Sequence, residues 1–187
     1  PDAEPMRERA ALSEIEKDIA RLERVTARFS DIGSLPRLEV QPVKPVVEAI
    51  VTYMRQRLPT QARKITLTSE VPEGLSANLN PELFEWVIEN LIKNALDAIE
   101  SPDGSIAVLA RQFEDRIRID VSDSGKGIDR RDAKHVFKPG YSTKKRGWGL
   151  GLSLAKRIVE DYHGGSLDLL VSKPGEGSTF RIEVAVA

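Results

Sequence analysis

Segments with helical and with strand-like patterning follow one another along this chain without strict alternation. Helical periodicity spans residues 46–58, 81–100 and 150–162, and the second of these segments begins with Asn80 as N-cap and Pro81 in the first turn. The strand-like segments are residues 64–71, 105–113, 116–122, 167–171 and 179–184, of which the second and third predict a hairpin. This order predicts an α+β fold with helices on one face of a mixed sheet.

The first 35 residues carry a different pattern. Residues 6–32 predict one long amphipathic helix whose apolar seam is Leu12, Ile15, Ile19, Leu22 and Phe29. Its length of about 40 Å and its narrow seam suit a helical hairpin or a dimer, and the alternative is a helix folded back onto its own domain. Gly33 and Pro36 end the helix, and Pro42 and Pro45 continue a linker with one short strand near residues 38–40. We therefore place a domain boundary at residue 35.

Composition excludes several functions. The 187 residues include 28 Lys and Arg against 29 Asp and Glu, so no net positive charge favours nucleic acid as a partner. The chain has no cysteine and two histidines, which excludes disulfides and leaves little for a zinc site. No apolar run is long enough to cross a bilayer. We expect this portion to be cytoplasmic, with any membrane attachment through segments outside this chain.

The charges are unevenly distributed. Residues 70–123 contain twelve acidic side chains and four basic ones, whereas residues 130–146 contain seven basic side chains opposed only by Asp132. Such runs are commonly solvated surfaces. The alternative interpretation is a basic loop lying over an anionic ligand.

Two short segments place polar side chains where packing does not explain them. Asn90 and Asn94 are one helical turn apart and share a face, so their amides could bind a hard cation or a phosphate, or simply form a hydrogen-bonded helix surface. Asp123 follows a strand and precedes Gly125 and Gly127. A carboxylate there could accept a hydrogen bond from an exocyclic amine such as that of adenine, although an ordinary turn has the same composition.

A glycine series leads into the predicted helix at Leu150. Gly147, Gly149 and Gly151 would present backbone N–H groups at a positive helix end, where a phosphate can bind. The spacing matches neither the Walker A loop nor the dinucleotide-binding fingerprint. The sequence therefore predicts a different phosphate-binding fold.

The order of these segments resembles the catalytic and ATP-binding domain of sensor histidine kinases, within the superfamily that includes DNA gyrase, MutL-type proteins and heat-shock chaperones. In that comparison the N box is residues 90–97, the first glycine box 123–127, the F box 137–145, the second glycine box 147–152 and the last glycine box 175–180. The resemblance implies a two-layer α/β sandwich of the Bergerat ATP-binding type over residues 36–187. It makes residues 1–35 the second helix of a dimerisation and phosphotransfer hairpin.

The resemblance also implies roles for individual residues, with ATP and Mg²⁺ as cofactors. Asn90 and Asn94 would be catalytic, Asn94 as the magnesium ligand, while Asp123 would recognise adenine with support from Thr179. Lys144, Lys145 or Arg146 would add charge from a mobile lid, and Phe137 and Trp148 would anchor it. The implied ATP-binding residues are Asn90, Lys93, Asn94, Asp97, Asp123, Gly125, Gly127, Ile128, Tyr141, Ser142, Thr143, Lys144, Lys145, Gly147, Gly149, Leu150, Gly151, Leu152 and Thr179.

The implied activity is transfer of the ATP γ-phosphate to a histidine on the helical hairpin, for relay to a response regulator. The partners implied are a second copy of the chain, paired through the hairpin, and a response regulator receiver domain. Alternatives are a serine-directed kinase of the anti-sigma type and a non-enzymatic nucleotide-binding scaffold. An ATP-driven clamp is disfavoured because hydrolytic relatives carry a glutamate where this chain has Asn90, which cannot act as a base at neutral pH.

Two further positions depart from the family pattern. The phosphoacceptor histidine of the family lies on the first hairpin helix, and neither His135 nor His163 matches it, so we expect both to be structural. Residues 138–141 read Lys-Pro-Gly-Tyr where a second phenylalanine is common in the F box. The packing of the lid is therefore not predicted by the resemblance.

Overall fold

A computed structural model of this chain describes residues 36–58, 64–142 and 149–187, and in them the backbone forms a five-stranded mixed sheet. The strands of the fold are β1 (Glu39–Pro42), β2 (Lys64–Glu70), β3 (Ser76–Leu79), β4 (Asp103–Phe113), β5 (Arg116–Asp123), β6 (Ser166–Lys173) and β7 (Gly177–Ala185). The main sheet has the order β2-β4-β5-β7-β6, parallel between β2 and β4 and antiparallel elsewhere. A small antiparallel pair, β1 and β3, lies outside it.

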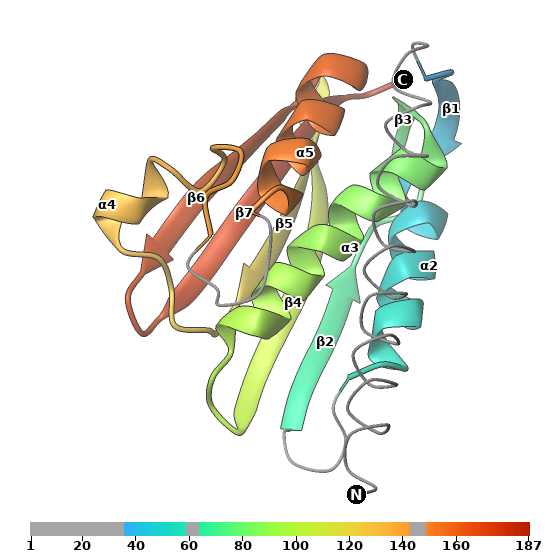
Figure 1. The fold of residues 1–187 in the computed structure, drawn as a ribbon. Helices are drawn as coiled ribbons and strands as arrows, with labels where there is room; N and C mark the ends of the chain where they lie inside the picture. Colours follow the sequence, from blue (N-terminus) through green and yellow to red (C-terminus); the bar gives the residue numbers. More distant parts are fainter. Residues whose placement is uncertain (1–35, 59–63, 143–148) are drawn as a thin grey trace, which may run out of the picture. The chain divides into compact units, whose positions relative to one another are not determined.

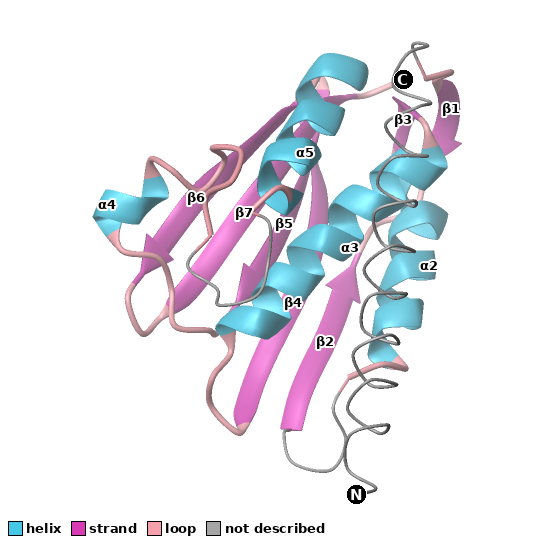
Figure 2. Cartoon of the chain, viewed as in Figure 1, coloured by secondary structure: helices cyan, strands magenta, loops and turns pink. Residues whose placement is uncertain are grey.

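The helices cover one face of this sheet, which confirms the predicted α+β architecture with two layers (Figure 1, Figure 2). They are α2 (Val43–Arg55), α3 (Pro81–Ala98), α4 (Arg130–Ala133), α5 (Gly151–Arg157) and a π-helix, η2 (Ile158–Tyr162), that continues α5. Helices α2 and α3 pack against each other, and α3 also contacts α5. Residues Leu38–Ala187 form one compact unit.

The two faces of the sheet have opposite chemistry because side chains alternate along each strand. The helix-facing positions are apolar, and Ile119 of β5 and Ile182 of β7 are fully buried. On the open face, directly paired residues of β5 and β7 interact: the hydroxyls of Ser122 and Thr179 lie 2.9 Å apart, and Arg181 makes two hydrogen bonds of 2.7 Å to Asp120. These cross-strand pairs fix the register of the two strands that lead to Asp123.

Helix α3 begins as predicted. The Asn80 side chain accepts a hydrogen bond of 3.0 Å from the Leu83 N–H, and Pro81 occupies the first turn. Its buried face includes Phe84, Ile88 and Leu91.

Several boundaries differ from the sequence prediction. Helix α2 begins at Val43, three residues early, because Pro45 lies in the first turn, where a proline is tolerated. Strand β3 and the four-residue helix α4 were not predicted, since four residues give too little periodicity. The predicted helix over residues 150–162 has the right extent, but its last turn is the π-helix.

His163 has a structural position, as predicted. Its side chain is 8% exposed, its Nε2 accepts a hydrogen bond of 3.1 Å from the Asn80 N–H, and its Nδ1 therefore donates to the Ile158 carbonyl at 2.8 Å. Burial lowers the pKa of the imidazole, against the effect of these hydrogen bonds. His163 thus joins the end of η2 to the start of α3 as a neutral ring.

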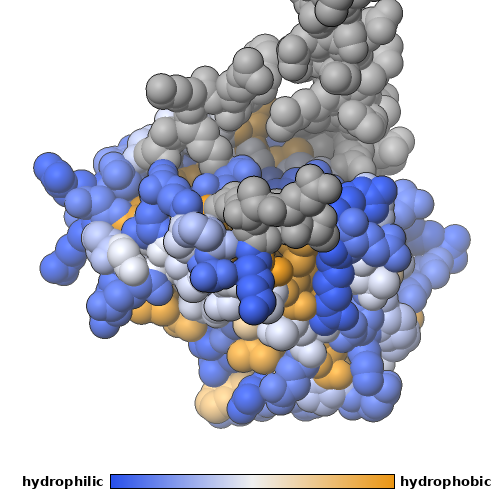
Figure 3. All heavy atoms as spheres, turned by 90° about the horizontal axis from the view of Figure 1, so that it is seen from below, coloured by the Kyte–Doolittle hydropathy of each residue, from blue (hydrophilic) through white to orange (hydrophobic). Residues whose placement is uncertain are grey.

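The predicted helix over residues 6–32 and the basic residues 143–146 lie outside the described residues, so these predictions and the boundary at residue 35 stay predictions. In the described part of the chain, no helix is long and apolar enough to span a bilayer. Seen from the lower end in Figure 1, the described surface is mainly hydrophilic with small hydrophobic patches (Figure 3).

Candidate functional site

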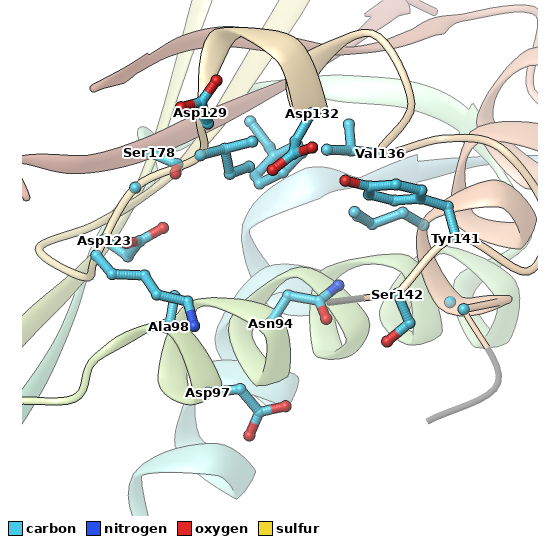
Figure 4. Close-up of a pocket in the computed structure, with 17 residues that line it drawn as sticks. Asn94, Asp97, Ala98, Asp123, Asp129, Asp132, Val136, Tyr141, Ser142 and Ser178 are labelled. Carbon is cyan, nitrogen blue, oxygen red and sulfur yellow. The ribbon is translucent and has the colours of Figure 1, made fainter. Parts of the chain in front are cut away.

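A pocket of about 420 Å³ lies where the motifs of the sequence come together (Figure 4). Its walls come from the second half of α3, the loop after β5, helix α4 with the segment that follows it, the start of α5, and β7. The lining residues are Asn94, Asp97, Ala98, Asp123, Lys126, Gly127, Ile128, Asp129, Asp132, Val136, Tyr141, Ser142, Gly149, Gly151, Leu152, Ser178 and Phe180.

Helix α3 contributes one face to the pocket. Asp97 and Ala98 follow Asn94 by three and four residues, so all three lie near one face of the helix and line the pocket. Asn90, one turn earlier, is not among the lining residues. Its side chain lies against the start of α5, where a Cβ on Gly151 would come within 2.4 Å of the Asn90 Oδ1. Asn90 therefore packs against Gly151 of the second glycine box. Its Nδ2 is buried without a hydrogen-bond partner among the described residues.

Asp123 ends strand β5 at the edge of the pocket. Its Oδ1 accepts a hydrogen bond of 2.8 Å from the Gly125 N–H, and the backbone N–H of Ser178 donates to the same carboxylate. Burial raises the pKa of Asp123, and these two hydrogen bonds oppose that shift without cancelling it. The carboxylate is thus held in one orientation, with capacity left to accept a further hydrogen bond.

The first and last glycine boxes close around Asp123 through backbone contacts. The Lys126 N–H donates to the Ala98 carbonyl at 2.9 Å, and the Lys126 carbonyl accepts from the Gly175 N–H at 2.7 Å. Gly177 has φ +99°, and a Cβ there would lie 1.9 Å from the Asp123 carbonyl oxygen. Only glycine fits so close an approach of the two segments.

The Thr179 side chain lies away from the pocket lining, and its predicted support of Asp123 stays a prediction. Residues alternate along β7, so the Thr179 hydroxyl pairs with Ser122 on the open face of the sheet and does not line the pocket. The neighbouring Ser178 lines the pocket and bonds Asp123 through its backbone.

The wall opposite α3 is formed by α4 and the first part of the F box. The Tyr141 hydroxyl points toward Asp132 and donates a hydrogen bond to its carboxylate, which raises the pKa of the phenol (Figure 4). Asp129 caps α4 by accepting from the Arg131 N–H at 2.9 Å, and this bond lowers the pKa of Asp129. The tyrosine that replaces the usual phenylalanine thus ties the F box to α4.

The lining is acidic overall. It contains four carboxylate residues, Asp97, Asp123, Asp129 and Asp132, and Lys126 is the one cationic residue among the lining positions, where it forms an ion pair of 2.9 Å with Glu100. The remaining surface is largely apolar, with Ile128, Val136, Leu152 and Phe180. This combination suits a flat aromatic ring that carries a hydrogen-bond donor.

The second glycine box forms the rim where α5 begins. Gly149 has φ +65°, and its carbonyl accepts a hydrogen bond of 3.1 Å from the Gly140 N–H of the F box. Gly151 and Leu152 line the pocket, whereas the Leu150 side chain is 41% exposed and does not.

The predicted ATP-binding residues therefore fall into three groups. The ones that line the pocket are Asn94, Asp97, Asp123, Gly127, Ile128, Tyr141, Ser142, Gly149, Gly151 and Leu152. The ones placed elsewhere are Asn90, Lys93, Gly125, Leu150 and Thr179, and Lys93 is an exposed side chain paired with Glu89. Thr143, Lys144, Lys145 and Gly147 lie outside the described residues, as do Arg146 and Trp148.

Seven lining residues were not predicted, and they are Ala98, Lys126, Asp129, Asp132, Val136, Ser178 and Phe180. Ala98 could have been found from its four-residue spacing to Asn94, and Ser178 and Phe180 from the strand alternation around Thr179. No sequence signal marks Asp132, because only the fold brings it to Tyr141.

The fold and the pocket define a nucleotide-binding domain, and comparison with known proteins gives its family. The chain belongs to the family described as histidine kinase-, DNA gyrase B- and HSP90-like ATPases, whose model matches residues 80–187. The resemblance to sensor histidine kinases is thereby confirmed, and membership of an ATPase family implies that the domain binds ATP.

Curated relatives point to the same group. The chain is 32% identical over 173 residues to the sensor histidine kinase ZraS of Klebsiella oxytoca, covering 91% of this chain and 37% of that protein. It is 28% identical over 174 residues to the nitrogen regulation protein NtrY of Azorhizobium caulinodans, covering 89% of this chain and 22% of the relative. The chain thus spans between about a fifth and two fifths of the length of these relatives.

Solved structures share the fold. The catalytic domain of histidine kinase ThkA matches with a TM-score of 0.70 and 22% identity, covering 81% of this chain and 97% of that one. Full-length ShkA in complex with AMPPNP matches with a TM-score of 0.79 and 22% identity, covering 99% of this chain and 40% of the neighbour.

Proposed function

We propose that this chain is the ATP-binding portion of a sensor histidine kinase, which transfers the γ-phosphate of ATP to a histidine on a helical hairpin for relay to a response regulator. The observation that carries the proposal is the Asp123 carboxylate, oriented by the N–H groups of Gly125 and Ser178 in the same pocket as Asn94. The family and the names of the relatives support the choice of histidine as acceptor.

The Asp123 end of the pocket is suited to adenine. A carboxylate accepts a hydrogen bond from the exocyclic amine, and Ile128, Val136 and Leu152 offer apolar surface to the ring. Gly127 and Gly149 keep the rim free of side chains. An ionised carboxylate accepts this bond more strongly than the protonated acid does, and the two backbone donors favour the ionised form.

Asn94 fits the magnesium ion that such a reaction needs. Its side chain lines the pocket and provides an amide oxygen, and magnesium in phosphotransfer sites takes few protein ligands besides the phosphate oxygens. Among the described residues no cluster of three or more His, Cys, Asp or Glu could hold a metal, which agrees with a site completed by the nucleotide. The ion would neutralise charge on the phosphates during transfer.

Transfer to another acceptor is favoured over hydrolysis. Asn90 stands where hydrolytic relatives have a glutamate, and it packs against Gly151, so the described residues offer no base at this point to activate water. Phosphoryl transfer needs mainly positioning and charge stabilisation, which the pocket can supply to an incoming imidazole. His163 is buried and hydrogen-bonded on both nitrogens, so it is not placed to accept a phosphoryl group, and we propose that the acceptor is a histidine of the hairpin.

The partners follow from the same proposal. We expect a homodimer through the hairpin to which residues 1–35 contribute, and a response regulator receiver domain as the next phosphate acceptor. One solved neighbour, ThkA, was crystallised in complex with the response regulator protein TrrA, at 20% identity and a TM-score of 0.74 to this chain. We propose a cytoplasmic position for this portion, with any membrane anchor in other segments.

Calorimetry with ATP and Mg²⁺ tests the site. The parent chain should bind ATP, and Asn94→Ala should weaken binding in the presence of Mg²⁺ far more than in its absence. Asn78→Ala is the matched control, because Asn78 is exposed on β3 and is not among the residues that line the pocket. Equal effects of the two substitutions would contradict the role of Asn94.

Labelling tests the reaction. The chain is mixed with radiolabelled ATP and a histidine-containing hairpin from a sensor kinase. Acid-labile phosphate on the hairpin supports the proposal, whereas acid-stable phosphate would indicate a serine-directed kinase. ATP binding without any transfer would favour a nucleotide-binding scaffold.

A further inference from the structure

Lys156 is a basic side chain of α5 that is held by three carbonyl or carboxylate groups. Its Nζ donates to the Leu167 carbonyl at 2.7 Å, and it forms ion pairs of 3.3 Å with Asp168 and 2.8 Å with Glu160. The side chain is 28% exposed. An α5 cation bound to both η2 and β6 in this way has little freedom to move.

The same ammonium lies over an aromatic ring of the F box. The distance from the Lys156 Nζ to the centre of the Phe137 ring is 4.7 Å. A cation over a ring face is attracted by the electron density there, and the attraction is stronger where the cation is partly shielded from water. Lys156 thus links Phe137 to α5.

Phe137 continues this chain of contacts to the pocket. Its ring meets Phe180 edge to face, with centroids 6.1 Å apart and an angle of 88° between the planes. Phe180 is 6% exposed and lines the pocket, and Val136, next to Phe137 in sequence, lines it as well. The wall formed by Val136 and Phe180 therefore connects to Lys156 through one ring.

We propose that Lys156 is a positioning residue that fixes Phe137 and, through it, the pocket wall of Val136 and Phe180. The wall is present in the structure whatever the domain binds. The inference rests on the proposed function only in taking the base of the nucleotide as the group that the wall contacts. Lys156 is not among the residues that line the pocket, so the proposed effect passes through Phe137.

The neighbouring Arg157 provides a matched control. It lies on the same helix and also forms an ion pair one turn on, at 3.3 Å to Asp161, but its side chain is 50% exposed, and none of the cation–ring contacts among the described residues involves it. If any salt bridge on α5 had the same effect, the two residues would be equivalent. The proposal predicts that they are not.

The first test does not depend on nucleotide. Methyl NMR spectra of Val136 are compared in the parent, Lys156→Met, Arg157→Met and Lys156→Arg. We expect the Val136 methyl chemical shifts to differ from those of the parent in Lys156→Met and to equal them in Arg157→Met. In Lys156→Arg they should lie close to the parent values. Unchanged Val136 shifts in folded Lys156→Met would overturn the proposal even if the protein binds no ATP.

The second test measures ATP affinity by calorimetry in Mg²⁺. Lys156→Met should bind ATP about tenfold more weakly, which corresponds to about 1.4 kcal/mol and lies in the range of a partly shielded cation–π contact. In a Phe137→Leu background, Lys156→Met should cause little further loss, because both substitutions break the same path. Additive losses would show that Lys156 acts otherwise and would refute the proposal.

The outcomes separate the two proposals. A parent chain that binds no ATP contradicts the proposed function, and the Val136 spectra then decide on Lys156. A parent that binds ATP as tightly as Lys156→Met leaves the proposed function intact and rejects the role of Lys156. If Lys156→Met does not fold, Lys156→Gln replaces it with the same expected results, since it keeps a donor for the Leu167 carbonyl without a charge over the ring.

Discussion

Replacing Asp123 by asparagine changes which base the pocket can accept. The carboxylate accepts hydrogen bonds from the N–H groups of Gly125 and Ser178 and has lone pairs left for the adenine amine. An asparagine has a single acceptor oxygen, which the backbone donors need. Its NH₂ group would then face the exocyclic amine, donor against donor.

The expected loss follows from the bond that is removed. A hydrogen bond to a charged acceptor contributes about 1.5 to 3 kcal/mol, so Asp123→Asn should weaken ATP binding by about tenfold to 150-fold. Inosine triphosphate has a carbonyl in place of the amine and can accept from the new NH₂ group. The variant should therefore lose less affinity for inosine triphosphate than for ATP, or gain some.

The stability of the unliganded domain should change little. Burial raises the pKa of Asp123, so the folded state holds its proton more tightly than the unfolded state. Stability from this group is present at low pH and is lost as pH rises through the raised pKa. At neutral pH the ionised carboxylate is thus a cost to folding, which asparagine removes while it loses about 1 kcal/mol of hydrogen bonding.

Calorimetry with both nucleotides and thermal unfolding measure these effects, with Asp120→Asn as the control. Asp120 is on the same strand, but it pairs with Arg181 on the open face. That variant should lose stability and keep its ATP affinity. If Asp123→Asn binds ATP within about twofold of the parent, or if its ratio of ATP to inosine triphosphate affinity is unchanged, the carboxylate does not select the base.

Further predictions concern the residues around the site that contribute to folding stability. Burial lowers the pKa of His163, so its contribution to folding stability is complete above the usual histidine pKa of about 6.5 and is lost as pH falls below that value. The thermal unfolding midpoint of the parent should therefore decrease between pH 7.5 and pH 5.5, and that of His163→Gln should decrease less. Gly151→Ala places a Cβ 2.4 Å from the Asn90 Oδ1 and should cost about 1 to 3 kcal/mol in urea unfolding, with partial recovery in the double variant with Asn90→Ala. Arg181→Met removes two bonds of 2.7 Å to the partly buried Asp120 and should cost about 1 to 3 kcal/mol in the same assay without a change in ATP affinity.

The parts of the site that the sequence predicted depend on local periodicity. Asn94 could be placed because its helix is defined in the sequence by an N-cap residue and by apolar periodicity. Asp123 could be placed because it ends a strand with regular alternation. The glycines were predicted because a close backbone approach permits no other residue, as the contact of Gly177 with the Asp123 carbonyl shows.

The parts that were missed depend on contacts between distant segments. Asn90 shares the helix face of Asn94 but is covered by Gly151, 61 positions along the chain, and no spacing rule contains that contact. The face of the sheet on which Thr179 lies could not be predicted, because a motif gives the segment and not the phase of strand alternation. The bond from Tyr141 to Asp132 likewise needs the path of the chain after α4.

The charge of the pocket explains why base and phosphate recognition must be separate. The described lining has four carboxylate residues and one lysine, which already pairs with Glu100, so this surface alone would repel a triphosphate. The lining can therefore select the base by hydrogen bonding and shape, but it cannot supply the attraction for the phosphates. Under the proposed function, that attraction would come from Mg²⁺ bound at Asn94, from the backbone N–H groups of the second glycine box and from basic residues such as Lys144 and Lys145, which adjoin the rim in sequence. On this account ATP affinity should depend steeply on Mg²⁺ and on ionic strength, whereas discrimination between ATP and inosine triphosphate, set by Asp123, should depend on neither.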